Sequence, residues 1–263
     1  MSIVTLIILS IIQGITEFLP ISSSGHLAII EHLLKFSESQ RMSYSAFLHL
    51  GTTLALIIFF AKRIEEILTS AVQKQNTQRQ KENISIIVAI IIGTIPVAIL
   101  GLLTKDSIDN LFTSPADALI FIIITGCILF VTRFAKERNN KINYLTALLI
   151  GTAQAMALLP GISRSGITIS AALFLGLSRE KSFEFSFLLS IPAVIGANIL
   201  VFKDITTNSA FVPLVLTVVI SCISGIIALY LLKRIVINKH FHKFAYYCWI
   251  FGCLGLVLIF TIR

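Results

Sequence analysis

Apolar runs of about 20 residues recur along the whole chain, and they constrain its fold more than any other feature. Lipid offers no partner for free backbone N–H and C=O groups, so a segment that crosses a bilayer forms a helix. The sequence therefore predicts an all-α, polytopic membrane protein with six transmembrane helices. The predicted crossings are Met42–Ala61, Ile84–Thr104, Ala116–Thr132, Phe183–Phe202, Phe211–Leu232 and Phe244–Ile262.

Composition excludes a water-soluble domain. Hydrophobic residues make up 56% of the 263 residues and charged residues 13%, against about 25% charged in an ordinary soluble domain. The formal net charge is +8, but the basic residues stand in short clusters between the apolar runs, without interleaved aromatics. This distribution indicates attraction to lipid headgroups, and we expect no binding to nucleic acid.

Two further apolar stretches, Ile3–Pro20 and Tyr144–Pro160, are interrupted by polar residues before they could cross. Each is followed by a turn rich in Ser and Gly and then by a second short apolar piece, Leu27–Phe36 or Ile167–Leu177. Two half-length helices that meet at a polar turn are typical of a re-entrant hairpin. Such a hairpin is tolerated where protein or a wet cavity surrounds the turn.

The two hairpins carry matching motifs. Gln13 and Ser22-Ser23-Ser24-Gly25 return 141 positions later as Gln154 and Ser163-Arg164-Ser165-Gly166. We therefore expect two repeats, residues 1–141 with a hairpin over 2–36 and residues 142–263 with a hairpin over 143–177, each followed by three crossings. Because three is an odd number, the second repeat enters the membrane inverted relative to the first.

The distribution of basic residues supports this topology. Fifteen of the 21 lysines and arginines lie in the segments 62–81, 133–141, 179–181 and 233–243, which share one side of the membrane in the predicted arrangement. The opposite side holds five, Lys35, Arg41, Lys105, Lys203 and Arg263, and Arg164 lies in the second motif. Positive residues gather on the cytoplasmic side, so both termini are expected outside and the polar tips are expected to meet near the midplane.

Glu17 is an ionisable group on an apolar element, and such groups usually mark function in a membrane. Gln13 lies four residues earlier, on the same helix face. In the turn that follows, a serine caps the start of a helix. The free backbone N–H groups of such a helix end attract anions. Structural alternatives stay open: Glu17 at the water interface or paired with a distant lysine, and an ordinary hydrogen-bonded His26.

The second motif supplies another helix N-terminus and adds Arg164, which is expensive near the midplane without an anion to bind. Its planar fork matches phosphate oxygens, although a structural ion pair with Glu17 would also account for it. The combined pocket is biased toward phosphate or pyrophosphate. Its candidate substrate-binding residues are Gln13, Ser22, Ser24, Gly25, Ser163, Arg164, Ser165 and Gly166.

With these motifs, residues 13–26 and 160–166, and with Glu184–Leu189 before Pro192, the chain resembles the bacterial undecaprenyl-diphosphate phosphatases, also called bacitracin-resistance proteins. The resemblance implies hydrolysis of a C55 polyprenyl diphosphate at the outer face of the cytoplasmic membrane, which recycles the lipid carrier of cell-wall synthesis. It also implies catalytic roles for Glu17, Ser23, His26 and Arg164. Either Ser23 or His26 attacks the phosphorus.

The chain departs from the family pattern at Gln13, where many members carry glutamate. We therefore expect a divalent cation, Mg²⁺ or Ca²⁺, to be held by Glu17, substrate oxygens and water, and to bind with the substrate. A transporter or lipid flippase built on the same inverted repeat is the alternative function, and a scaffolding protein ranks last. The polyprenyl lipid and the membrane are the expected partners, and a homodimer is left open.

Overall fold

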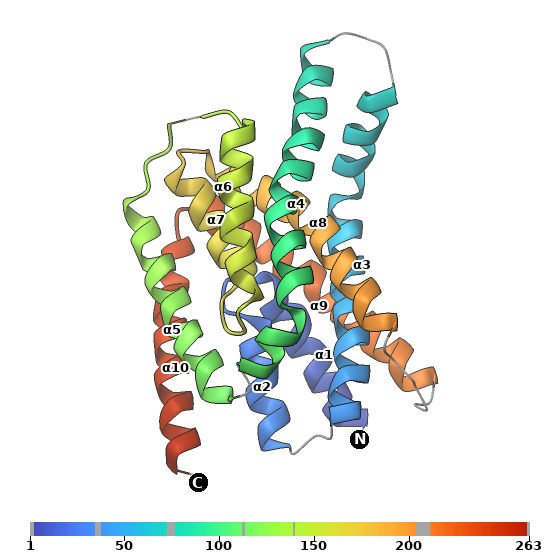
Figure 1. Cartoon of the computed structure of the whole chain (residues 1–263), viewed down its shortest axis with the longest axis vertical. Helices are drawn as coiled ribbons and strands as arrows, with labels where there is room; N and C mark the ends of the chain where they lie inside the picture. The colour runs from blue at the N-terminus through green and yellow to red at the C-terminus, as the bar shows by residue number, and fades with distance from the viewer. Residues whose placement is uncertain are drawn as a thin grey trace.

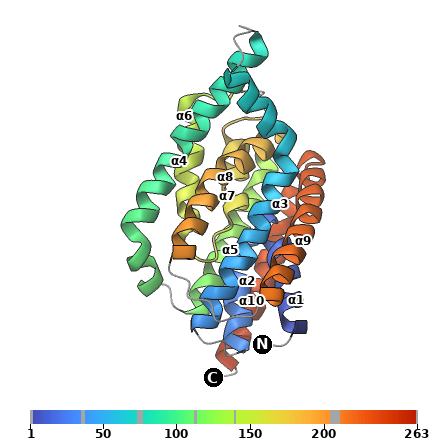
Figure 2. The same ribbon diagram turned by 90° about the vertical axis from the view of Figure 1, so that its right-hand side faces the viewer.

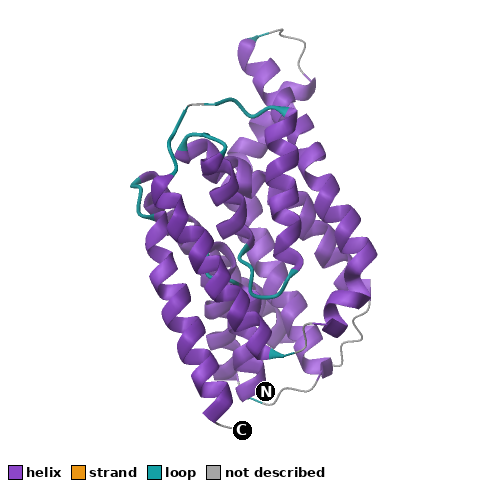
Figure 3. Ribbon diagram, turned by 60° about the vertical axis from the view of Figure 1, so that its left-hand side comes forward, coloured by secondary structure: helices purple, strands orange, loops and turns teal. Residues whose placement is uncertain are grey.

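The computed structural model describes residues 3–34, 38–72, 77–111, 114–138, 140–203 and 211–261. Within these ranges every regular element is helical, as Figure 3 shows. The α-helices are α1 (Ile3–Phe18), α2 (Ser23–Leu33), α3 (Glu38–Val72), α4 (Gln78–Leu111), α5 (Pro115–Val131), α6 (Tyr144–Ala155), α7 (Arg164–Phe174), α8 (Arg179–Lys203), α9 (Phe211–Ile237) and α10 (Phe244–Thr261). Three short 3₁₀ segments are η1 (Thr132–Phe134), η2 (Met156–Leu158) and η3 (Phe241–Lys243).

Six of these helices are long and apolar enough to cross a membrane, which confirms the predicted all-α, polytopic class. The spans are Tyr44–Val72, Gln78–Thr104, Pro115–Phe134, Arg179–Val201, Val212–Ile237 and Phe241–Thr261. Helices α1 and α6 are apolar but shorter. Each predicted crossing falls on one of the six spans.

Several predicted boundaries were wrong, because charged residues end an apolar run without ending the helix. The crossing predicted to end at Ala61 continues to Val72, and the one predicted to begin at Ile84 begins at Gln78. Ion pairs stabilise these extensions: Arg63 Nε lies 2.6 Å from Glu184 Oε1, and Arg79 Nη2 lies 3.0 Å from Glu66 Oε2. The extensions place α3, α4 and α8 in contact beyond their apolar runs.

The short helices form two hairpins that approach the middle of the molecule from opposite ends. Figure 1 shows α1 and α2 towards the end that carries both termini, and α6 and α7 towards the other end. The second arms begin in the serine turns, at Ser23 and Arg164, as the predicted serine caps imply, and so before the apolar pieces that start at Leu27 and Ile167. Residues 2, 35 and 36 of the first predicted hairpin lie outside the described ranges.

Each hairpin packs against a long helix of the other half of the chain. Helix α1 lies along α9, and α6 lies along α4, an arrangement that Figures 1 and 2 both show. Small residues allow these close contacts: a Cβ on Gly14 would meet Ser224 of α9, and a Cβ on Gly151 would meet the Gly93 backbone of α4. Close approach of backbones through small residues is the usual way in which membrane helices associate.

The packing of each hairpin on a helix of the other half is compatible with two repeats, residues 1–141 and 142–263, that pack into each other. The end of the molecule that carries the termini is opposite the end where α3 and α4 meet (Figure 1). The division into inverted repeats and the depth of the hairpins in a bilayer stay predictions.

Candidate active site

The first tip connects α1 to α2 through a sharp turn at Ser22. Ser22 has a φ of 68°, a left-handed conformation that is uncommon for a residue with a side chain. Its Oγ accepts a hydrogen bond from the Gly25 N–H at 3.3 Å and lies 3.1 Å from Ser24 Oγ. Ser22 therefore caps α2, and Ser23 becomes the first residue of that helix.

The second tip has the same side-chain cap in α7, although the capping residue, Ser163, has an extended backbone with a φ of −75°. Ser163 Oγ accepts from the Gly166 N–H at 3.2 Å and lies 3.3 Å from Ser165 Oγ. Ser163 is thus the cap, and Arg164 stands at the first helical position, where α2 has Ser23. Both tips present the N-terminus of an 11-residue helix, an end that favours anions.

The two tips touch each other. The Gly161 N–H donates to Ser24 Oγ at 3.3 Å, and Arg164 Nη2 donates to Glu17 Oε1 at 2.9 Å. The Glu17 side chain is 10% exposed and that of Arg164 is 17% exposed, so each charge depends on the other for compensation. The expected meeting of polar tips is present, and Arg164 forms the ion pair that was the structural alternative.

The second oxygen of the Glu17 carboxylate also has partners. Ser23 Oγ donates to Glu17 Oε2 at 2.7 Å, and Gln13 Nε2 donates to the same oxygen at 3.2 Å. A hydroxyl this close to a carboxylate can give up its proton to it. The carboxylate of Glu17 thus joins a candidate nucleophile, Ser23, to a candidate phosphate ligand, Arg164.

These groups face a common polar cavity of about 360 Å³. It lies within the range of roughly 300–1,000 Å³ that is usual for small-molecule sites. Glu17, Ser23 and Arg164 line it, together with Ser22, Ser24 and Ser163. The wall is completed by residues of α3, α4 and α8 and by Gln154 at the end of α6.

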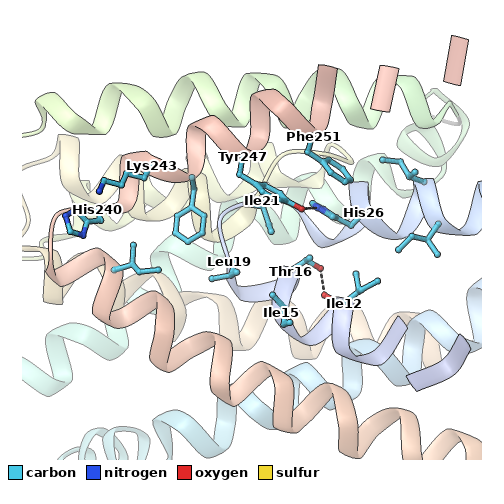
Figure 4. Close-up of a pocket in the computed structure, with 14 residues that line it drawn as sticks. Ile12, Ile15, Thr16, Leu19, Ile21, His26, His240, Lys243, Tyr247 and Phe251 are labelled. Atoms are coloured by element: carbon cyan, nitrogen blue, oxygen red, sulfur yellow. Dashed lines mark hydrogen bonds between the residues drawn. The ribbon is translucent and has the colours of Figure 1, made fainter. Parts of the chain in front are cut away.

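His26 lies elsewhere. It lines a larger, mostly apolar cavity of about 780 Å³ on the other side of the first tip, between α1, α2 and α10, which Figure 4 shows. Its Nδ1 is 2.7 Å from the Ser22 carbonyl oxygen, and its Nε2 is 2.8 Å from the Tyr247 hydroxyl. The ring also stacks on Phe251, with 4.1 Å between the centroids. Both ring nitrogens are therefore occupied, and neither bonds to Glu17.

The remaining predicted site residues support the tips instead of lining the polar cavity. Gly25 packs against Ile122, where a Cβ would collide with that side chain, and Gly166 packs beside its cap Ser163. Ser165 is buried and bonds to Ser163. Gln13 is fully buried behind Glu17, and its Oε1 has no hydrogen-bond partner among the described residues.

Four polar residues of the cavity wall were missed by the sequence analysis as site residues: Ser45, His49, Gln154 and Asn198. His49 Nδ1 is 3.1 Å from Gln13 Nε2 and 3.7 Å from Glu17 Oε2. A signal was available for His49, since a histidine within an apolar span is a candidate functional group by default. Asn198, which donates to Thr53 Oγ1 at 2.8 Å, gave no comparable signal.

The site offers few ligands for a metal ion by itself. Among the described residues no group of three or more His, Cys, Asp or Glu side chains could hold one. The Glu17 carboxylate lines the cavity and offers the oxygen donors that Mg²⁺ and Ca²⁺ prefer, whereas Gln13 Oε1 is buried behind it. Glu17 fits a cation that completes its coordination with oxygens from a substrate and water.

The chain is similar to one protein family along most of its length. Residues 6–254 match the family described as bacitracin resistance protein BacA. The chain is 43% identical over 244 residues to an undecaprenyl-diphosphatase of Thermosipho africanus, covering 92% of this chain and 94% of the relative. It is 40% identical over 247 residues to that of Methanococcus maripaludis, with 93% and 95% covered, and 36% identical over 265 residues to that of Halothermothrix orenii, with 98% of each covered.

Proposed function

The chain belongs to the bacitracin resistance protein BacA family, and we propose that its polar cavity hydrolyses undecaprenyl diphosphate to undecaprenyl phosphate and inorganic phosphate. The observation that carries this proposal is the 2.7 Å contact between Ser23 Oγ and Glu17 Oε2, beside Arg164. A conduction path needs neither a nucleophile nor a base, so this contact favours the phosphatase over the transporter.

The chemical step follows from that contact. Glu17 Oε2 takes the Ser23 proton as Ser23 Oγ attacks the terminal phosphorus, and the bond from that phosphorus to the bridging oxygen breaks. Undecaprenyl phosphate leaves with the bond's electron pair and takes up the proton from Glu17, which becomes a carboxylate again. Water then attacks the phosphoserine, Glu17 accepts its proton, and inorganic phosphate leaves while Ser23 regains its hydrogen.

Arg164 and the two helix N-termini would neutralise charge on the transferred phosphoryl group, which is the main task in phosphoryl transfer. Arg164 has one recorded guanidinium partner among the described residues, Glu17 at 2.9 Å. Its other N–H groups have no partner within the described part of the chain and can bind phosphate oxygens. The pair with Glu17 holds the guanidinium at the cavity before the substrate arrives.

His26 acts on the tip and not on the phosphorus. Its Nδ1–H donates to the carbonyl oxygen of Ser22, the residue that precedes Ser23. The Tyr247 hydroxyl donates to Nε2 and so selects this tautomer. His26 therefore holds the left-handed Ser22 in place, and Ser23 is the nucleophile in this proposal.

A divalent cation would be held by Glu17 together with oxygens of the substrate and water. When bound, it would add positive charge beside the phosphates. The requirement for substrate oxygens follows from the small number of protein ligands, and it agrees with a cation that binds together with the substrate.

The position of the cavity supports a site on the outer face of the cytoplasmic membrane. Ser45 and His49, from the early part of α3, and Asn198, from the later part of α8, line the cavity, and these parts lie toward the end that carries both termini (Figure 1). The basic clusters stand at the other end, which is cytoplasmic by the positive-inside rule. A phosphatase oriented in this way acts on the lipid carrier at the outer face, where the carrier has been used in cell-wall synthesis, and so recycles it.

Phosphate release from undecaprenyl diphosphate by the purified protein in detergent tests the function. Detergent removes the sealed compartment that transport requires but leaves hydrolysis intact. We expect turnover in the wild type and a loss of at least about 1,000-fold in Ser23→Ala. Acid-quenched enzyme should carry phosphate on Ser23. Phosphate found on His26, or full activity of Ser23→Ala, would contradict this mechanism.

A further inference from the structure

Gln154 is a polar residue of the cavity wall whose side chain is entirely unpaired. It is 0% exposed, and neither its Oε1 nor its Nε2 has a hydrogen-bond partner among the described residues. Buried amides normally make hydrogen bonds, because leaving one without partners destabilises the folded protein. An amide that is kept in this state needs a partner from outside the chain.

The packing of α6 explains how Gln154 is held there. Gly151, one helical turn earlier, lies against Gly93 of α4, where a Cβ would overlap the Gly93 backbone. Residues three apart share a helix face, so this contact fixes the face of α6 on which Gln154 stands. Gly93 is followed one turn later by Val97, which lines the same cavity as Gln154.

The neighbours of Gln154 in the wall cannot satisfy its amide. Val97, Ala157 and Leu158 all line the cavity, and none of their side chains carries a hydrogen-bonding group. The wall also contains polar residues, but the Gln154 amide forms no hydrogen bond to any of them: Glu17, Ser22, Ser23, Ser24, Ser45, His49, Ser163, Arg164 and Asn198. The partners of Gln154 must therefore be contents of the cavity.

Gln13 is the counterpart of Gln154 in the first half, and unlike Gln154 it has a hydrogen-bond partner for its amide nitrogen. Gln13 Nε2 donates to the Glu17 carboxylate, so its amide nitrogen serves a negative group. Gln154 has no carboxylate at the corresponding place, since Leu158 of η2 stands four residues after it. A negative group supplied by a ligand would complete the second half of the site in the same way.

We propose that Gln154 is a substrate-binding residue whose Nε2 donates to a phosphate oxygen of the diphosphate, while Oε1 accepts from a water molecule held beside that phosphate. This inference rests on the proposed function and adds a contact from the second hairpin. The neutral amide binds the phosphate without adding charge to a cavity in which Glu17 and Arg164 already compensate each other.

The test compares Gln154→Met with Thr152→Val in the full-length protein. Methionine keeps the length of glutamine without its hydrogen bonds. Thr152 is an exposed residue of the same helix whose Oγ1 bonds to the Leu148 carbonyl, so it controls for the loss of a polar group on α6. Phosphate release gives kcat/KM. Thermal unfolding is measured with and without methylenediphosphonate, a diphosphate mimic that cannot be hydrolysed.

We expect Gln154→Met to lower kcat/KM by roughly 10- to 100-fold, the loss of one hydrogen bond to a charged group. Its Tm without ligand should equal or exceed that of the wild type, because an unpaired buried amide has been removed. Methylenediphosphonate should raise the Tm of the wild type and of Thr152→Val more than that of Gln154→Met. Gln154→Glu should be at least as impaired, since its carboxylate repels phosphate.

Unchanged kcat/KM in Gln154→Met would overturn the inference. A Tm below the wild-type value would overturn it too, because it would show that the amide is bonded within the protein. If the wild type released no phosphate, the proposed function would fail, while the methylenediphosphonate comparison would still decide the role of Gln154.

Discussion

Arg164 Nη2 and Glu17 Oε1 lie 2.9 Å apart, although 147 positions separate the two residues in the chain. The carboxylate belongs to the first hairpin and the guanidinium to the second. This pair joins the two tips, and the Ser23 hydroxyl on the other carboxylate oxygen places it at the centre of the proposed reaction.

Arg164→Lys tests whether the fork of the guanidinium matters beyond its charge. Lysine keeps the positive charge near Glu17 but cannot bind two phosphate oxygens in parallel. We expect kcat/KM for undecaprenyl diphosphate to fall roughly 30-fold, or about 2 kcal/mol. Arg133→Lys is the matched control, since Arg133 is exposed and lies over Phe130 and Phe134, outside the cavity. Turnover of Arg164→Lys equal to that of the control would argue against bidentate phosphate binding.

Tyr247→Phe tests the positioning role of His26. The change removes the hydroxyl that lies 2.8 Å from Nε2 and leaves the ring that lines the apolar cavity (Figure 4). Loss of one neutral hydrogen bond, worth about 1 kcal/mol, should lower kcat about fivefold with little change in KM. Tyr246→Phe, a change at the neighbouring exposed tyrosine, provides the control. A rise in KM alone would point to substrate binding by Tyr247 instead.

Removal of divalent cations tests the cofactor proposal. Chelation with EDTA should abolish phosphate release, and Mg²⁺ or Ca²⁺ should restore it. The Tm of the substrate-free protein should stay the same, because the described residues provide no site with three acidic, His or Cys ligands. A large fall in Tm on chelation would instead show that the protein binds the cation tightly without substrate.

Gly151→Ala tests the contact between α6 and α4. A Cβ there overlaps the Gly93 backbone, and overpacking of this kind costs about 1–3 kcal/mol. We expect a Tm several degrees lower, together with lower activity, because α6 carries Gln154. Gly196→Ala is the control, since a Cβ on Gly196 meets nothing within 4 Å. Equal melting temperatures for the two variants would contradict the close packing of α6 on α4.

The six crossings and the meeting of the tips could be predicted from the sequence. Apolar length determines the crossings, and the repeat of Ser22-Ser23-Ser24-Gly25 as Ser163-Arg164-Ser165-Gly166 implied two similar turns. The structure contains these turns, with the same cap and the same hydroxyl pair in each. A polar motif in an apolar chain is informative because lipid excludes it, so it must lie inside the protein, in a wet cavity or at the membrane surface.

The sequence could not predict that the His26 side chain points into the apolar cavity and away from Glu17. Helical side chains lean toward the N-terminus, and His26 reaches back four residues to the Ser22 carbonyl, whose place depends on the left-handed φ of Ser22. Tyr247, its other partner, lies 221 positions away. Likewise, the unpaired amide of Gln154 becomes visible only when α4 and α8 close the cavity around it.

The division of charges between the two hairpins has a consequence for how the protein is made. While the first half inserts during translation, the Glu17 carboxylate has no guanidinium to balance it, since Arg164 emerges much later. A nascent chain therefore carries a carboxylate on an apolar hairpin without a guanidinium partner. Insertion of the second half supplies Arg164, which pairs with Glu17 and completes the candidate site. Partly synthesised chains should be inert toward the carrier lipid.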